Sequence, residues 1–287
     1  MTNAKFYLED LKTKFRKINP EEYYLSYSGG KDSHLLYWFI KEYAPEFSNI
    51  EVIGINTYME HPQILERIQK NCDKVLFPTM KPFEIKEKYG IPCFSKLQDD
   101  FIDRYQKGSR TESLMNRLYS KNKDGSKSWF GVSKKARKLL FADKLHKIAP
   151  TCCKKLKKEP ARNYEKESKK KAILGVRSGE SKLRQAQYKS CFQKNGKFTP
   201  LWDLTDELEE AIYKEFNIET PTIYEKVKRT GCMGCPYGSR QHDTEKELEL
   251  LTEAQRKFVC DYFKESYEVL GIDANNEKRA KKSKNGS

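Results

Sequence analysis

The 287-residue sequence contains only four histidines, and just 37% of its residues are hydrophobic. None of its apolar runs approaches the roughly 18 residues of a membrane span, so we expect no membrane partner. The N-terminal segment is charged and lacks the apolar stretch of a secretory signal. We therefore expect a cytoplasmic protein, a compartment where disulfides are rare and clustered cysteines usually bind metal or act in catalysis.

Arginine is scarce among the basic residues, supplying 13 of the 56 that face 41 acidic residues. Residues 121–171 alone hold 18 Lys/Arg and 5 Asp/Glu, a net charge of +13. Such a concentrated basic region suggests a polyanionic partner, here tRNA or DNA. Proteins that read nucleic-acid sequence usually rely on arginine, so a lysine-rich, solvated surface without a partner is the alternative.

Strand and helix patterns alternate along the chain, and 12% aromatic residues argue for a folded core. This order predicts an α/β fold: a parallel twisted sheet with flanking helices, plus a C-terminal Cys-rich helical segment. Strands are predicted at 23–28, 50–57, 74–79 and 171–177 and briefly from Pro200, and helices at 4–18, 34–43, 61–71, from Asp203 or Thr205, and at 245–270. Thr244 and Glu247 predict a capping box at the start of the last helix. Residues 121–133 are expected to form a mobile loop.

A glycine-containing loop links the first predicted strand to the following helix. Two glycines let backbone amides approach an anion closely, and the helix N-terminus adds its dipole. Serine hydroxyls and a lysine can also contact phosphate, while an aspartate in this position caps the helix or holds Mg²⁺. The loop residues are Ser28, Gly29, Gly30, Lys31, Asp32 and Ser33. An ordinary Gly-Gly turn with a helix cap is the competing interpretation.

The loop SGGKDS differs from the GxxxxGK[ST] loop of common NTPases. It resembles the signature of the PP-loop ATP pyrophosphatases, the adenine nucleotide alpha-hydrolase-like superfamily. That resemblance implies an enzyme that cleaves ATP between its α and β phosphates, holds pyrophosphate at this loop and adenylates a substrate. It implies that Lys31 and Asp32 take part in catalysis.

Two further segments are similar to the phosphoadenosine phosphosulfate (PAPS) reductase-like family within that superfamily. Residues 56–62 resemble a TG-E-P-like segment, which implies that Thr57 and Glu60 contribute to the nucleotide site. Residues 175–184, GVRSGESKLR, resemble the family's GxRxxESxxR motif. Arg177 and Arg184 would then be catalytic phosphate ligands, and Glu180 would orient one of them. A solvated charged loop is the alternative for this second segment.

Five cysteines are candidate metal ligands: Cys152, Cys153, Cys191, Cys232 and Cys235. The CxxC turn 232–235 points two thiolates at one centre, and a vicinal pair rarely forms its own disulfide. The resemblance implies a [4Fe–4S] cluster, because CC followed by a distant CxxC is a cluster pattern of some relatives. Zn²⁺ is the alternative occupant. Cys72, Cys93 and Cys260 are expected to be buried apolar residues.

The sequence thus predicts an ATP-dependent enzyme that adenylates an acceptor for iron–sulfur-assisted sulfur transfer, with a sulfur-donor protein as a further partner. A sulfonucleotide reductase and a non-enzymatic, zinc-stabilised nucleic-acid-binding module are the alternatives. The first is disfavoured because residues 261–287 contain no cysteine for a reductase-type nucleophile. Four regions are expected: an N-terminal helix at 1–21, the PP-loop domain at 22–205 with a basic insertion at about 97–150, a cluster-binding segment at 206–273, and a disordered basic tail at 274–287.

Overall fold

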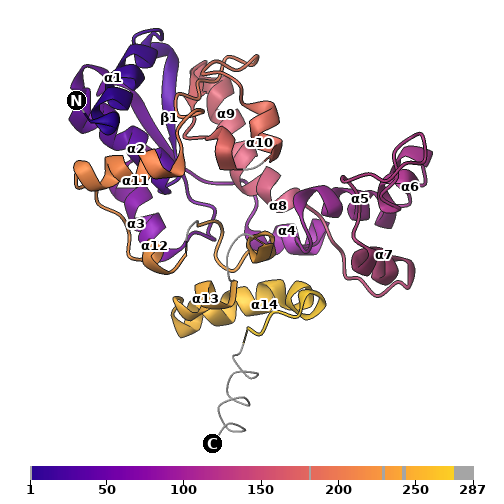
Figure 1. The fold of residues 1–287 in the computed structure, drawn as a ribbon. Helices are drawn as coiled ribbons and strands as arrows, with labels where there is room; N and C mark the ends of the chain where they lie inside the picture. Colours follow the sequence, from indigo (N-terminus) through magenta and orange to yellow (C-terminus); the bar gives the residue numbers. More distant parts are fainter. Residues whose placement is uncertain (1, 181, 228–229, 241–243, 275–287) are drawn as a thin grey trace, which may run out of the picture. The chain divides into compact units, whose positions relative to one another are not determined.

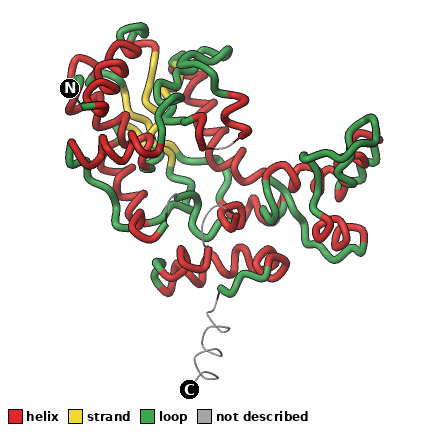
Figure 2. The backbone as a smooth tube through the Cα atoms, viewed as in Figure 1, coloured by secondary structure: helices red, strands yellow, loops and turns green. Residues whose placement is uncertain are grey.

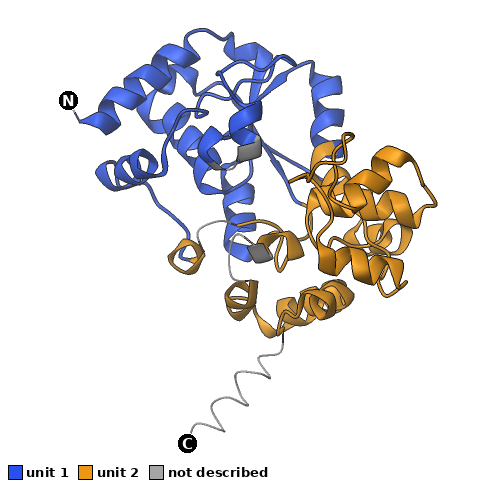
Figure 3. Ribbon diagram, turned by 45° about the vertical axis from the view of Figure 1, so that its right-hand side comes forward, with its two compact units in different colours: residues 1–56, 62–78, 159–222 blue, residues 57–61, 79–158, 223–287 orange. Residues whose placement is uncertain are grey.

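The computed structural model describes residues 2–180, 182–227, 230–240 and 244–274. They form two compact units, each assembled from separate stretches of the chain (Figure 3). Unit 1 comprises residues 1–56, 62–78 and 159–222, and unit 2 comprises residues 57–61, 79–158 and 223–287. Within the described ranges, no helix is long and apolar enough to cross a membrane.

Unit 1 contains a four-stranded parallel sheet with the order β3-β2-β1-β4. The strands are β1 (Tyr23–Tyr27), β2 (Glu51–Ile55), β3 (Lys74–Leu76) and β4 (Lys171–Ile173). The chain adds strands outward from β1 to β3 and then returns to the other side of β1. The carboxyl ends of β1 and β4 therefore flank the point where the strand order reverses, which is where ligands bind in open α/β sheets.

Helices cover both faces of this sheet, as Figures 1 and 2 show. The helices of unit 1 are α1 (Asn3–Phe15), α2 (Lys31–Trp38), α3 (Pro62–Asn71), α9 (Glu159–Ser168), α10 (Lys182–Gln187) and α11 (Asp206–Glu215). Tyr164 of α9 packs on Tyr24, Ile53 and Ala172 on one face. On the other face α3 lies so close to Gly54 that an added Cβ would meet Ile68. The predicted α/β architecture is confirmed.

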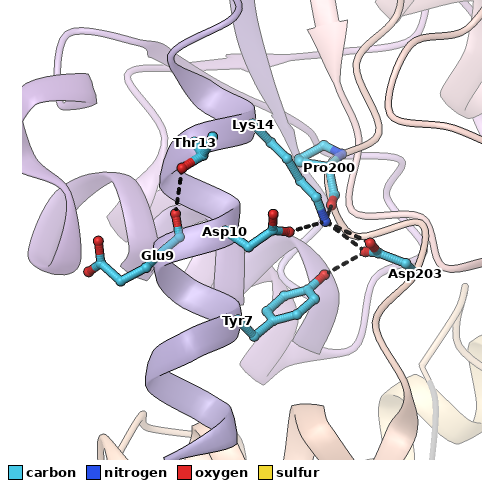
Figure 4. Close-up of polar contacts among 7 residues, drawn as sticks. All are labelled: Tyr7, Glu9, Asp10, Thr13, Lys14, Pro200 and Asp203. Carbon is cyan, nitrogen blue, oxygen red and sulfur yellow. Dashed lines mark hydrogen bonds and ion pairs between the residues drawn. The ribbon is translucent and has the colours of Figure 1, made fainter. Parts of the chain in front are cut away.

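The buried side chain of Lys14 links α1 to the segment that precedes α11 through an ion pair with Asp203 (Figure 4). Lys14 Nζ donates to both carboxylate oxygens of Asp203, at 2.9 and 2.8 Å, and it also lies 2.9 Å from Asp10. Tyr7 donates its hydroxyl to Asp203 at 3.0 Å. Because these charges are paired and hydrogen-bonded, Lys14 can be buried without the full cost of an isolated charge.

Unit 2 is helical in its described part. Its helices are α4 (Pro82–Tyr89), α5 (Lys96–Gln106), α6 (Glu112–Leu118), α7 (Lys134–Phe141), α8 (Thr151–Cys153), α12 (Ile223–Lys226), α13 (Thr244–Glu249) and α14 (Glu253–Leu270). In one apolar cluster, side chains of α14 pack with those of α4, α8 and Met233, which lies within the CxxC turn 232–235. A second cluster joins α5, α6 and α7. The basic insertion predicted at about 97–150 falls within this unit.

Three local predictions were wrong. The expected helix 245–270 is broken between α13 and α14, and the capping box is formed by Thr252 with Gln255 instead of Thr244 with Glu247. The chain from Pro200 makes successive turns instead of a strand, because Trp202 N and Leu204 N bond to carbonyls three residues back. The stretch 121–133 is a loop, as predicted, and it contains a turn closed by a bridge between Lys121 and Lys127.

Candidate functional site

The predicted phosphate loop lies between β1 and α2 in unit 1. Gly29 adopts φ +73°, and an added Cβ would lie 2.8 Å from Ile64 Cγ2 and 2.9 Å from the Ile64 carbonyl oxygen. Only glycine fits this left-handed, tightly packed position. Gly30 is the N-cap of α2 and supplies no side-chain cap. The first backbone amides of α2 are therefore suited to hold an anion.

Hydroxyl groups tie the two ends of the loop together. Ser33 Oγ donates to the Gly30 carbonyl at 3.0 Å and accepts from the Ser28 amide at 3.2 Å. The two serine hydroxyls lie 3.1 Å apart. Tyr213 of α11 donates its hydroxyl to the Lys31 carbonyl at 2.8 Å. These bonds set the shape of the loop, so the serines contribute to its geometry as well as offering groups to a ligand.

The segment after β4 packs directly on the loop. An added Cβ on Gly175 would lie 2.8 Å from the backbone carbon of Asp32 and from the amide of Ser33. Two residues further on, Arg177 Nε lies 2.5 Å from Asp32. The two segments singled out in the sequence therefore contact each other within unit 1, at the carboxyl ends of β1 and β4.

Arg177 is surrounded by three carboxylates. Besides Asp32, its guanidinium lies 2.5 Å from Asp206 and 3.3 Å from Glu209, and its side chain is almost fully buried. Burial, followed by the negative charge of Asp32, raises the pKa of Glu209 to about 7. Sequence reasoning missed Asp206 and Glu209, because they begin a helix that carries no recognisable motif. Together with Asp32 they place three carboxyl groups against one guanidinium.

Arg67 of α3 is a second residue that sequence reasoning missed. It donates from Nη1 to the Gly29 carbonyl at 3.2 Å and from Nη2 to the Glu219 carbonyl at 2.7 Å. It lines a cavity of about 560 Å³ between α2, α3 and the segment 217–222. Arg184 lies on α10 and is partly exposed. Glu180 lies in the turn Ser178–Glu180, and its side chain is outside the described part of the structure.

Thr57 and Glu60, predicted for the nucleotide site, belong to unit 2 and lie beside the CxxC segment. The Thr57 hydroxyl donates to Glu60, and Glu60 forms an antiparallel bridge with Cys232. Lys157 Nζ lies 3.5 Å from Glu60. In the structure, these residues therefore support the cysteine region of their own unit.

Four of the five candidate cysteines belong to unit 2 and influence one another's ionisation. A hydrogen bond with Cys152, aided by the charges of Lys96 and Lys157, lowers the pKa of Cys153 to about 6. That hydrogen bond, together with burial, raises the pKa of Cys152. Burial raises the pKa of Cys232 to about 11 and also raises that of Cys235. The negative charge of Cys232 in turn raises the pKa of Lys157.

Cys191 lies in unit 1, and the charged groups that act on it are Lys14, Asp203 and Lys17. Among the described residues, no three His, Cys, Asp or Glu side chains stand in an arrangement ready to hold a metal ion. The donor chemistry of Cys152, Cys153, Cys232 and Cys235 nevertheless fits a thiophilic centre, since three of these thiols interact with Lys157 and Cys152 is hydrogen-bonded to Cys153. Of the other cysteines, Cys93 is fully buried, as predicted, whereas Cys72 and Cys260 are partly exposed.

The loop, the reversal of strand order and Arg177 together define an α/β unit suited to a phosphate-bearing ligand. No protein-family model matches the chain, and no curated protein matches it either.

Among solved structures, the chain is similar to phosphoadenylyl-sulfate (PAPS) reductase from Candida auris in its phosphate complex. The identity is 15%, the TM-score is 0.38, and the match covers 78% of this chain and 93% of that chain. It is also similar to NH3-dependent NAD synthetase from Campylobacter jejuni in complex with nitrate, with 13% identity, a TM-score of 0.35, and coverage of 93% and 94%.

Proposed function

We propose that the protein is an ATP-dependent PP-loop enzyme that cleaves ATP to pyrophosphate and transfers AMP to an acceptor. The observation that carries this proposal is the contact between the loop after β1 and the segment after β4. Gly175 packs on Asp32 and Ser33, and Arg177 pairs with Asp32 at the reversal of strand order. A site at this position combines backbone amides, a helix N-terminus, a lysine and an arginine, all of which favour phosphates.

In the proposed reaction, a nucleophilic atom of the acceptor attacks the α phosphorus and the bond to the bridging oxygen breaks. The electron pair stays on the departing pyrophosphate, where negative charge grows. The loop amides, the N-terminus of α2 and Lys31 would stabilise that charge. Arg177 would exchange a carboxylate partner for a phosphate oxygen, and Arg184 of α10 would assist. Ser28 and Ser33 would keep the loop in shape.

The carboxyl groups around Arg177 fit a magnesium ion, because Mg²⁺ prefers oxygen ligands and three of them lie against one guanidinium. Asp32 is the residue that would hold it, with Glu209 beside it. When bound, the ion supplies charge neutralisation for the triphosphate. Arg177 would compete with a bound Mg²⁺ for these carboxylates. The guanidinium would then be available to contact the substrate.

Within unit 2, Cys152, Cys153, Cys232 and Cys235 are the residues that would hold a [4Fe–4S] cluster, with Zn²⁺ as the alternative. Lys96 and Lys157 favour the thiolate form of Cys153. The pKa values of the other three thiols are raised, so their deprotonation would accompany ligation. When bound, an iron–sulfur cluster supplies electrons or a site for a sulfur ligand. Sulfide released by a donor protein would attack the acceptor atom that bears AMP. The bond to sulfur forms as the bond to the phosphate oxygen breaks, and AMP leaves with that electron pair as the second product.

The test is product analysis with ATP labelled at the α phosphate and with the cluster intact under anaerobic conditions. We expect AMP and pyrophosphate, and we expect Lys31→Ala to slow their release about 30- to 1,000-fold, the loss for one good transition-state contact. Lys5→Ala on α1 is the matched control and should have no effect. Formation of ADP, or equal rates in the Lys31 and Lys5 variants with acceptor present, would refute the proposal. Reduction of a sulfonucleotide without ATP cleavage would favour the reductase alternative.

A further inference from the structure

Two neighbouring aromatic side chains of unit 2 are exposed to solvent. Trp129 is 93% exposed and Phe130 is 59% exposed. Exposed apolar residues are common singly, but a fully exposed tryptophan next to an exposed phenylalanine leaves a large apolar area in water. Neither ring is used by the ATP site or by the cysteines of the proposed function.

The backbone on either side of these rings is anchored. Ser128 is buried, its amide donates to the Ser120 carbonyl at 2.7 Å, and its hydroxyl accepts from Arg117 at 3.0 Å and from the Phe130 amide at 3.1 Å. Val132 is buried and its amide donates to the Arg117 carbonyl at 3.1 Å. The backbone that carries Trp129 and Phe130 is therefore fixed on both sides by buried, hydrogen-bonded residues, while the two rings remain exposed.

Three lysines belong to the same turn. The bridge between Lys121 and Lys127 closes it, and Asp124 accepts from the Ser126 amide at 3.0 Å and from its hydroxyl at 2.6 Å. Lys121, Lys123 and Lys127 are all exposed. Lys127 Nζ lies 6.0 Å from the centre of the Trp129 ring. Positive charge and aromatic surface thus lie side by side on one short turn.

The neighbouring helices repeat this combination. Arg137 of α7 lies 4.9 Å from the centre of the Tyr119 ring, and Phe141 lies 5.7 Å from the same ring. Tyr119 and Phe141 are 46% and 41% exposed. Residues 117–138 carry eight Lys/Arg and a single acidic residue, Asp124. A surface that combines flat rings with a single sign of charge is complementary to a chain of unpaired bases on a phosphate backbone.

We propose that this aromatic–lysine surface, formed by Lys121, Lys123, Lys127, Trp129 and Phe130, binds single-stranded nucleic acid. Bases stack on the two rings while the lysines contact phosphates. The inference deepens the proposed function, because it assigns the acceptor to single-stranded nucleic acid and names where the chain holds it. Binding itself needs neither ATP nor the cluster. Protein interfaces are depleted of lysine, which disfavours a protein as the occupant.

The test measures binding of fluorescent single-stranded RNA and DNA of 16 nucleotides, and of the matching duplex, to the full-length protein across a series of salt concentrations. We expect single strands to bind more tightly than duplex, with a log–log salt slope of about −0.7 for each phosphate neutralised. Trp129→Ala should weaken binding about 5- to 150-fold, the loss of one stacked base, whereas Trp129→Phe should retain most of it. Changing Lys121, Lys123 and Lys127 together to Glu should weaken binding and flatten the slope.

The matched controls lie on other elements. Phe6→Ala removes a ring that is 69% exposed on α1, and changing Lys5, Lys17 and Lys169 together to Glu makes the same change of charge. Far-ultraviolet circular dichroism verifies that each variant is folded. Equal losses in the control and surface variants, no binding near physiological salt, or binding only to vesicles of anionic lipid would overturn the inference. Lys31→Ala should leave binding unchanged, so that loss of pyrophosphate release and loss of nucleic-acid binding remain separate results.

Discussion

Arg67 Nη1 lies 3.2 Å from the carbonyl oxygen of Gly29, so a side chain of α3 holds the backbone of the phosphate loop. In a trans peptide unit the C=O and the following N–H point in opposite directions. Fixing the Gly29 carbonyl toward α3 therefore directs the Gly30 amide away from α3. The position of Arg67 thus sets the orientation of an amide that the proposed function assigns to pyrophosphate.

Arg67→Met is expected to weaken pyrophosphate and ATP binding by about 10- to 150-fold, because a hydrogen bond from a charged donor contributes roughly 1.5–3 kcal/mol. Isothermal titration calorimetry measures both affinities. Lys70→Met, one turn further along α3 and exposed, is the control and should leave both unchanged. Arg67→Lys, which keeps the positive charge, should retain part of the wild-type affinity for both ligands. Wild-type affinity in Arg67→Met would show that the loop keeps its geometry without the hydrogen bond from Arg67.

Gly29→Ala is expected to destabilise unit 1 by about 1–3 kcal/mol, the range for a residue held in a sparsely populated backbone region. The φ of +73° disfavours alanine, and the Ile64 carbonyl that its Cβ would meet is backbone and cannot swing aside. Thermal unfolding measures the loss. Gly179→Ala is the matched control, since its Cβ would enter open space. If the two variants unfold at the same temperature, the close approach of α3 to the loop is not a constraint.

Stability should also depend on the protonation of His34, a buried residue of α2. Burial, together with the charge of Arg67, lowers the pKa of His34 to about 3 from its ordinary value of 6.5. Between these pH values the unfolded chain binds a proton that the folded chain does not. The free energy of unfolding contributed by His34 is therefore present above pH 6.5 and falls as the pH is lowered, by up to about 1.4 kcal/mol per pH unit.

His34→Asn should reduce this dependence, because an amide can replace the contact between Nδ1 and the Tyr27 hydroxyl at 2.9 Å without titrating. Urea unfolding at a series of pH values from 7 downward measures the slope. Tyr37→Phe keeps the ring that stacks on His34 and should keep the wild-type slope. An unchanged slope in His34→Asn would assign the acid sensitivity to other groups.

The β1–loop–α2 unit was predictable because its signals are local: an aromatic strand, two glycines and the start of a helix within a dozen residues. Arg67, Asp206 and Glu209 were not predictable, because each reaches the loop through the packing of a helix distant in sequence. The break at Thr252 was missed because both Thr244 and Thr252 fit a capping box in sequence, and the reciprocal bonds of Gln255 favour the second. Thr57 and Glu60 were placed by resemblance, and the structure places them in unit 2.

Four cysteines of unit 2 are expected to hold the metal centre of the proposed function. Cys152, Cys153, Cys232 and Cys235 interact electrostatically within unit 2, whereas Cys191 belongs to unit 1 and Cys260 lies on α14. Serine at any of the first four positions should therefore lower the iron content and visible absorption of anaerobically purified protein. A serine hydroxyl does not ionise near neutral pH and is a poor ligand for a soft metal.

Cys191→Ser and Cys260→Ser are the matched controls and should keep the iron of the wild type, because neither thiol lies in the group around Lys157. Metal analysis of iron and zinc per chain, together with the ultraviolet–visible spectrum, measures the outcome without any enzyme assay. Loss of iron in Cys191→Ser would place that cysteine in the ligand set after all. Stoichiometric zinc without iron in the wild type would remove the redox part of the proposed function and leave the ATP site untouched, since the loop and Arg177 contain no cysteine.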